Sequence, residues 1–136
     1  MRINITAGEC LKEILEAKYP GERFVPFNEA MIYGTYSEPL FSEGFIKERS
    51  AANGINETDY RNNMAGFIEV LEHIDEYGEI VLWFGDEPFC VENRRTVLEA
   101  LVERDYCGIV IMNTVNELTG GIIVQESIRM GAHASC

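Results

Sequence analysis

Acidic side chains follow three apolar segments that the sequence predicts to be β-strands. Glu9 follows the first strand, Glu29 the second, and Asp86 and Glu87 the third. If the strands are parallel neighbours, their carboxyl ends meet at one edge of a sheet and bring these side chains together. Carboxylates in that arrangement can hold Mg²⁺ or Mn²⁺, which positions a phosphate and a water molecule. One hypothesis is therefore a metal-dependent phosphoester hydrolase with Glu9, Glu29, Asp86 and Glu87 as ligands.

The same acidic residues have a simpler interpretation. Asp and Glu are favoured in the first turn of a helix, because they accept hydrogen bonds from free N–H groups and oppose the positive end of the helix dipole. Glu9, Asp86 and Glu87 all lie at predicted helix starts, with Asp86 as the expected N-cap. Helix capping and metal binding are both open at this point.

Cys90 lies in the first turn of the helix predicted after Asp86, where the helix dipole would lower its pKa and favour the thiolate. A nucleophilic cysteine also needs a base, and the two histidines are His73 and His133. His73 is expected at the opposite end of its helix from Cys90, so a buried, inert thiol is the default interpretation. There is no nucleophile elbow and no zinc-protease motif, so the sequence assigns no catalytic residue.

Glycines stand beside two predicted helix starts, at Gly8 and Gly85, where free N–H groups can bind an anion. There is no dinucleotide-binding glycine motif and no P-loop. Arg49 lies in the segment expected to cover this edge, and Trp83 ends a buried strand where it can form a pocket wall. The leading hypothesis is a domain that binds a small polar or nucleotide-like ligand at this edge. The predicted ligand-binding residues are Gly8, Glu9, Glu29, Arg49, Trp83, Gly85, Asp86, Cys90 and Asn93.

The elements that would position these residues follow from hydrophobic periodicity. A β-type run at 3–6, apolar residues at helical spacing over 11–18 and a second β-type run at 23–25 make a β-α-β unit, which predicts parallel strands. Residues 28–57 are irregular and rich in aromatic side chains. We expect this segment to be an ordered, partly helical excursion over one end of the sheet.

The second half of the chain repeats the alternation of strand and helix. A helix capped by Thr58 precedes an apolar run at 80–84, which is typical of a central strand buried on both faces. Another helix, a buried strand at 109–112 and a final strand at 122–124, antiparallel or at an edge, complete the pattern. This order predicts an α/β fold: a three-layer, Rossmann-like sandwich with a mainly parallel sheet and an irregular aromatic-rich insertion.

A chain of 136 residues fits one domain, expected at 1–130 with a frayed tail at 131–136. Its net charge of −12 disfavours binding to nucleic acid or an anionic membrane. No apolar run reaches the ~20 residues of a membrane span, and no signal peptide is recognised, so a cytoplasmic location is expected. The four cysteines are widely spread and are interpreted as free thiols. A third hypothesis is an interaction module, such as a homodimer, with the aromatic excursion as its contact surface.

The segment Trp83–Asn93, WFGDEPFCVEN, resembles the W-F-G-x-D-x-F-C/D-x-x-N-L-L signature of a bacterial family of domains of unknown function, number eighteen thirty-five in its series. Residues 5–9 match the family's I-x-N-G-D opening, and residues 26–31 match its P-W-x-D-x-L. Gly34 stands at the glycine of a following H-E-G-P motif, and Arg49 at a later arginine.

This resemblance covers residues 3–115 and implies the α/β fold and the location of the site, but it names no substrate. Two departures change side-chain length, since Glu9 and Glu29 stand where the family has Asp. Three more fall on the H-E-G-P motif, so a polar role for its His does not carry over: Ile32, Tyr33 and Thr35. We expect a divergent member whose site is altered.

Overall fold

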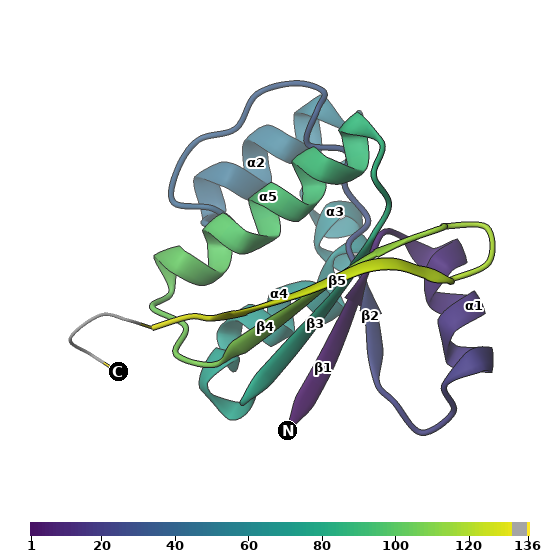
Figure 1. The fold of residues 1–136 in the computed structure, drawn as a ribbon. Helices are drawn as coiled ribbons and strands as arrows, with labels where there is room; N and C mark the ends of the chain where they lie inside the picture. The colour runs from purple at the N-terminus through teal and green to yellow at the C-terminus, as the bar shows by residue number, and fades with distance from the viewer. Residues whose placement is uncertain (132–135) are drawn as a thin grey trace.

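The computed structural model describes residues 1–131 and 136. This part of the chain is mixed α/β (Figure 1). The elements in chain order are β1 (Arg2–Thr6), α1 (Glu9–Lys18), β2 (Phe24–Pro26), α2 (Glu43–Ala52), α3 (Glu57–Asn63), α4 (Ala65–Glu72), a 3₁₀ turn (Ile74–Glu76), β3 (Glu79–Phe84), α5 (Pro88–Glu103), β4 (Ile109–Val115) and β5 (Ile122–Arg129).

The strands form one sheet in the order β2-β1-β3-β4-β5. The first four strands run parallel, and β5 pairs antiparallel with β4 at the edge. β3 lies in the middle, and every residue from Ile80 to Phe84 is buried, as its continuous apolar run predicts. The mainly parallel sheet was predicted from the sequence. The final strand was expected at 122–124, antiparallel or at an edge; β5 is both, and it extends to Arg129.

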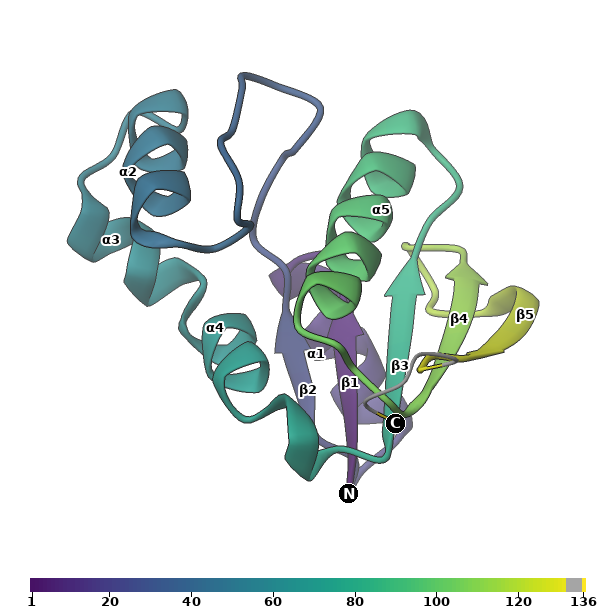
Figure 2. The ribbon, with the colours of Figure 1, turned by 90° about the vertical axis from the view of Figure 1, so that its left-hand side faces the viewer.

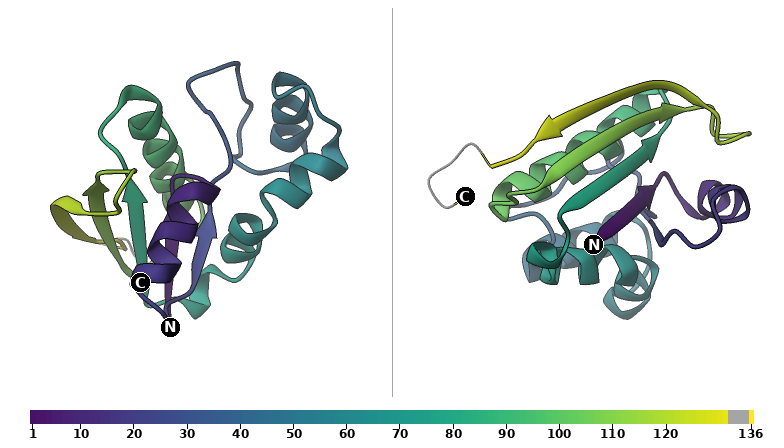
Figure 3. Two further views of the ribbon diagram at one scale, coloured as in Figure 1. Left: turned by 90° about the vertical axis from the view of Figure 1, so that its right-hand side faces the viewer. Right: turned by 60° about the horizontal axis from the view of Figure 1, so that its bottom comes forward.

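Helices lie on both faces of the sheet, but they cover the faces unequally. α4 and α5 pack on one face, and α2 and α3 lie on the same side but farther from the strands (Figure 2). Of the helices in the described residues, α1 is the one on the other face; it lies over β1 and β2 and does not extend over β4 and β5 (Figure 3). The larger apolar core is on the α5 face, and a smaller one, centred on Leu11, Leu15 and Trp83, lies beneath α1.

The aromatic-rich segment after β2 is ordered and partly helical, as expected, because its rings enter the larger core. Phe41 contacts Phe45 and Phe67 with ring centroids 4.6 and 5.0 Å apart, and Phe67 contacts Phe27 at 5.0 Å. Tyr33 is the exception, with 72% of its surface exposed. Most of the aromatic surface predicted to bind a partner is therefore buried within the chain itself.

The helix expected after Thr58 is divided into α3 and α4 at Met64. The N-cap is Asn56, whose side chain accepts a hydrogen bond from the backbone N–H of Asp59. Met64 has a φ of −105°, outside the helical range, and α4 begins after it in a new direction. The break lets α4 approach β2 so closely that a Cβ on Gly66 would lie 3.1 Å from Val25.

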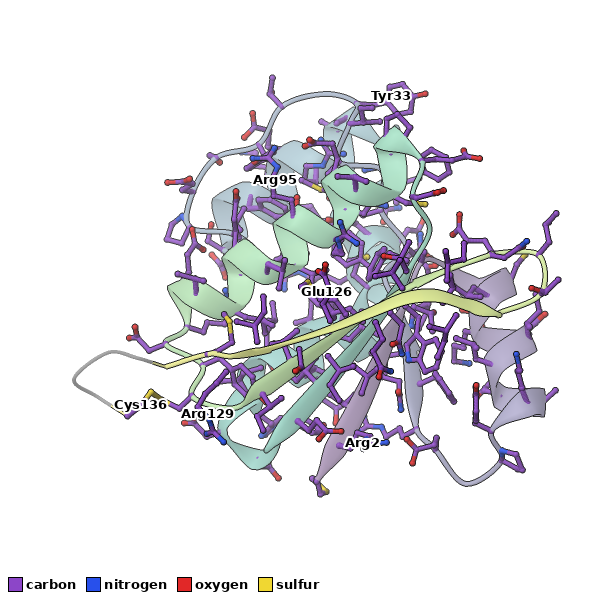
Figure 4. The ribbon with its side chains drawn as sticks, in the orientation of Figure 1. Arg2, Tyr33, Arg95, Glu126, Arg129 and Cys136 are labelled. Atoms are coloured by element: carbon purple, nitrogen blue, oxygen red, sulfur yellow. A yellow bond between two sulfur atoms is a disulfide. The ribbon has the colours of Figure 1, made fainter. Side chains whose placement is uncertain are left out.

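The free-thiol interpretation is wrong for Cys107 and Cys136, which form a disulfide; Cys136 is labelled in Figure 4. Gly131, with a φ of 96°, lies so close to Cys107 that a Cβ at this position would be 2.8 Å from the Cα of Cys107. Of the predicted frayed tail at 131–136, residues 132–135 lie outside the described residues. No helix in the described part of the chain is both long enough and apolar enough to cross a bilayer.

This arrangement predicts three classes of cysteine. Cys10 is exposed and Cys90 is buried, and both are free. A thiol reagent should therefore modify Cys10 in the native protein, Cys90 only after denaturation, and Cys107 and Cys136 only after reduction. Mass spectrometry of the alkylated protein distinguishes the three steps. Labelling of Cys107 without a reductant would contradict the disulfide.

Candidate functional site

A cavity of about 390 Å³ lies at the carboxyl ends of β1 and β2, beside the starts of α1 and α5. We call it the edge cavity. Figure 2 shows the arrows of the parallel strands, such as β2 and β3, pointing toward the end of the sheet at which α5 begins. The lining residues are Ala7, Gly8, Phe27, Asn28, Glu29, Ala30, Asn53, Phe89, Cys90 and Asn93.

The predicted ligand-binding residues are only partly brought together. Those that line the edge cavity are Gly8, Glu29, Cys90 and Asn93. Gly85 and Asp86 line a separate cavity of about 420 Å³, together with Glu87. Arg49 is buried against Glu29, and Trp83 belongs to the small core on the α1 face.

Both helices at the edge cavity begin without a side-chain cap. α1 starts after Gly8, whose φ of 90° is in the left-handed region that favours glycine. α5 has Glu87 rather than Asp86 as its N-cap, because Pro88 sets the first helical φ, and the Glu87 side chain makes no capping bond. Side-chain capping therefore does not explain these turns, although Glu9 lies in the first turn of α1, where its charge opposes the helix dipole. First-turn N–H groups are left for solvent or a ligand.

A buried ion pair between Glu29 and Arg49 forms the floor beside the edge cavity. The contact is bidentate: Arg49 donates from Nε to Oε2 at 2.9 Å and from Nη2 to Oε1 at 2.8 Å. The side chains are 0% and 1% exposed, respectively. Since an arginine fork matches the two oxygens of a carboxylate, this pair fixes the position of both residues.

Three further donors complete the environment of the Glu29 carboxylate. Tyr60 donates from its hydroxyl to Oε2 at 2.7 Å, Asn53 donates from its amide at 3.2 Å, and the backbone N–H of Ala30 donates at 2.8 Å. Burial alone would raise the pKa of Glu29, but the hydrogen bonds from Arg49, Tyr60, Ala30 and Asn53 outweigh it and hold the pKa below its ordinary value. Glu29 is therefore ionised and fully occupied by its own chain.

Arg49 also holds the loop that follows Glu29. Its Nη1 donates to the carbonyls of Tyr33 at 2.7 Å and Thr35 at 3.2 Å, and its Nη2 donates to that of Ala30 at 3.2 Å. Gly34 allows this approach, because its φ is 75° and a Cβ there would lie 3.1 Å from Arg49 Nη1. Arg49 was expected to close over a ligand. Instead, from its position in α2, it binds the loop that follows Glu29.

Asn93 binds the same loop from α5. Its Oδ1 accepts from the N–H of Met31 at 2.9 Å, and its Nδ2 donates to the carbonyl of Glu29 at 2.7 Å. The side chain thus pairs with the backbone as a neighbouring strand would. Sequence reasoning found Glu29, Arg49 and Asn93 but missed Tyr60 and Asn53. The helical face that carries Tyr60 predicts its burial, but no local pattern predicts which carboxylate it meets.

The carboxylates predicted to bind a metal ion are not gathered into a metal-binding group. Among residues 1–131 and 136, no cluster of three or more His, Cys, Asp or Glu side chains is suited to hold a metal. Glu29 forms an ion pair with Arg49, while Glu9 is exposed, with its Oε1 3.4 Å from Nζ of Lys12. Asp86 and Glu87 are also exposed and lie in the other cavity. The geometry therefore gives no support to the metal-dependent hydrolase.

Cys90 is an unreactive thiol. It is fully buried, and its Sγ donates to Oε2 of Glu117 at 3.1 Å. Burial, with the adjacent Glu117 carboxylate, raises the pKa of Cys90 to about 12, so the thiol is protonated at neutral pH. The expectation that the helix dipole lowers this pKa is wrong, because burial and the acidic neighbour outweigh the dipole.

Comparison with known proteins adds no assignment. No protein-family model matches the sequence, and no curated protein matches it significantly.

The ion pair predicts a pH-dependent stability. Replacing Glu29 with Gln leaves Arg49 charged and unpaired in the interior, which should lower the free energy of unfolding by about 3–5 kcal/mol at neutral pH. Because the folded pKa of Glu29 is depressed, its contribution is complete above its unfolded pKa of about 4.3 and disappears as the pH falls through the folded value. Urea unfolding of both proteins at several pH values should show a difference that shrinks below about pH 4.

The matched control is Glu92→Gln, which breaks an exposed ion pair with Arg95. Because water screens an exposed pair, this change should leave the free energy of unfolding nearly unchanged at any pH. If Glu29→Gln were as mild as Glu92→Gln, the structural role of the buried pair would be refuted.

Proposed function

We propose that the chain binds a small polar or nucleotide-like ligand in the edge cavity. The observation that carries the proposal is the position of the cavity: it lies at the carboxyl ends of parallel strands, beside two helix starts without side-chain caps. Ligands of α/β proteins bind at this end of the sheet. A volume of about 390 Å³ is also within the usual range for small-molecule sites.

The rigid floor of the cavity supports the proposal. Glu29, Arg49 and Asn93 hold the loop after β2 by hydrogen bonds that need no ligand. This floor is preorganised, so a ligand does not lose binding free energy to ordering the loop. Because Arg49 neutralises Glu29, the donors left at the cavity are uncharged. They suit a ligand that presents hydrogen-bond acceptors to the first-turn N–H groups of α1 and α5.

We also propose that the chain is a divergent member of the family that the Trp83–Asn93 segment resembles, with the Rossmann-like layering implied by that likeness. The contacts give the shared residues a physical reason to recur together. Glu29, Arg49 and Asn93 each hold the same loop, so the loss of one leaves the others with unpaired buried groups. On this proposal the shared residues maintain the cavity and do not themselves select its ligand.

Self-association is a second proposal, and β5 rather than the aromatic excursion supports it. β5 is an edge strand, and all eight of its residues are exposed. Its exposed apolar side chains are Ile122, Ile123, Val124 and Ile128. An open, apolar edge offers unpaired backbone groups to another strand, and a second copy of β5 would cover it in a homodimer.

The edge cavity is tested by NMR titration of the labelled protein with ribose 5-phosphate, adenosine and adenosine monophosphate. We expect saturable shifts in the amide signals of Glu9, Cys10, Phe89 and Cys90, because these N–H groups lie in the first turns of α1 and α5. Asn28→Phe should weaken binding at least tenfold, since Asn28 is an exposed residue of the cavity wall.

Asn62→Phe is the matched control, because Asn62 is exposed on α3 and outside the cavity. It should leave binding unchanged. Absence of shifts at these amides with all three compounds would refute ligand binding in the edge cavity.

Analytical ultracentrifugation tests the homodimer. If β5 pairs with its copy, the wild-type protein should sediment as a dimer and Val124→Lys as a monomer, because a charge on the edge opposes strand pairing. Val102→Lys is the control, since Val102 is exposed on α5. A wild-type protein that remains monomeric at high concentration would contradict the homodimer.

A further inference from the structure

A third hollow, apart from the two cavities described above, lies on the opposite face of the sheet, beside α1. Its volume is about 370 Å³. The left panel of Figure 3 shows α1 in front of β1 and β2, with β4 and β5 left open beside it. We call this hollow the α1 groove. Its lining residues are Arg2, Asn4, Tyr19, Glu22, Phe24, Val81, Trp83, Ile111, Asn113, Ile122 and Gln125.

The floor of the α1 groove is a row of three residues on adjacent strands. Trp83 on β3 is in register with Asn113 on β4, and Asn113 is in register with Gln125 on β5. Side chains alternate between the faces of a strand, and the neighbours of Asn113 on the other face, such as Met112, belong to the larger core. The row therefore presents an indole and two amides to the same hollow.

Trp83 provides a rigid aromatic wall. Its Nε1 donates to Oδ1 of Asn4 at 2.9 Å, and Asn4 in turn donates from Nδ2 to the carbonyl of Arg23 at 2.9 Å. The rings of Tyr19 and Phe24 pack against the indole with centroids 5.6 and 6.3 Å away. The indole is therefore held in one orientation, as a stacking surface for a flat ligand should be.

Each of the two amides in the row uses one of its two polar atoms in a hydrogen bond within the chain. Gln125 donates from Nε2 to Oδ1 of Asn113 at 2.8 Å. Nδ2 of Asn113 and Oε1 of Gln125 have no partner among residues 1–131 and 136, although Asn113 is only 2% exposed and lines the groove. If both amides were rotated by 180°, their oxygen and nitrogen atoms would exchange places, and one donor and one acceptor would still be left unpaired. The free donor and the free acceptor lie side by side and open into the groove, so they match a ligand edge that carries an acceptor next to a donor.

The charges at the groove favour an uncharged ligand. Arg2 is the cation of the lining, and it forms ion pairs with Glu22, at 3.4 Å, and with Glu79. In Figure 4, Arg2 lies at the amino-terminal end of β1. A phosphate or carboxylate would have to displace these carboxylates, whereas a neutral group does not.

We propose that the α1 groove binds a neutral, planar heterocycle whose edge carries an adjacent hydrogen-bond donor and acceptor, as a nucleobase or a carboxamide ring does. The ring packs against the wall formed by Trp83 and Tyr19, and its edge completes the hydrogen bonds of Asn113 and Gln125. This site is distinct from the edge cavity and shares no lining residue with it.

The experiment uses the fluorescence of Trp83, the single tryptophan of the chain. The probes are 9-methyladenine, 1-methylcytosine and nicotinamide, whose NH₂ group is their one N–H donor, and each is compared with the derivative in which that NH₂ group is dimethylated. At least one parent compound should change the emission saturably, and its dimethyl derivative should bind at least tenfold more weakly, because it retains the ring and loses the donor. A derivative that binds as well as its parent, or no saturable change with any parent compound, would overturn the proposal.

Two variants locate the effect in the groove. Asn113→Leu keeps the side-chain shape and removes the amide, so it should weaken binding of the same probe at least tenfold. Glu126→Gln is the control, because Glu126 pairs with Met112 on the α5 face of the sheet (Figure 4). Thermal unfolding monitored by circular dichroism verifies that both variants fold. A folded Asn113→Leu protein with wild-type affinity would refute the assignment.

The result is independent of the edge cavity. The readouts there are the amide signals at the starts of α1 and α5, and ribose 5-phosphate, which has no base, is a probe for that site alone. Binding in one site and failure in the other are therefore separate outcomes.

Discussion

The loop after β2 depends on one buried ion pair, between Glu29 and Arg49. Two charges in the interior are tolerated only when nearly every lone pair and proton finds a partner, and here Tyr60, Asn53 and backbone groups provide those partners. Because the partners come from α2, α3 and the loop itself, the pair joins segments whose apolar side chains, such as Phe45 and Ile46, belong to the same core as the sheet. Polar contacts therefore fix the loop at the edge of the sheet, while the apolar core holds the sheet and these segments together.

This division between polar and apolar contacts explains why residues that are typical of a catalytic site can instead hold the structure together. A carboxylate, an arginine and an asparagine near the carboxyl ends of parallel strands are residues that an enzyme would use. Here Glu29, Arg49 and Asn93 satisfy one another and the backbone, and Cys90 is protonated and bonded to Glu117. The groups left for a ligand are backbone N–H groups at the starts of α1 and α5, which the sequence indicated only through Gly8 and Gly85.

The fold was largely predictable, because each element is encoded by local periodicity. The run from Ile80 to Phe84 predicts a central strand, and that strand is central. The break at Met64 was missed because it depends on how closely α4 packs on β2. The positions of Glu29 and Asn93 at the cavity were predicted, but their roles were not, since each role depends on partners 20 to 64 residues away. The row Trp83–Asn113–Gln125 exists only through strand register, which composition does not contain.

Asn93 and Asn113 are both nearly buried asparagines, and they differ in one respect. Both polar groups of Asn93 are bonded within the chain, whereas Asn113 keeps an unused donor at the α1 groove. The folded chain therefore keeps an unpaired amide group open to the groove on one face of its sheet. A molecule that pairs with this group binds the native state alone, so recognition at the groove and conformational stability become linked equilibria. Binding in the groove would then raise the free energy of unfolding of the whole fold, even though no segment needs to move.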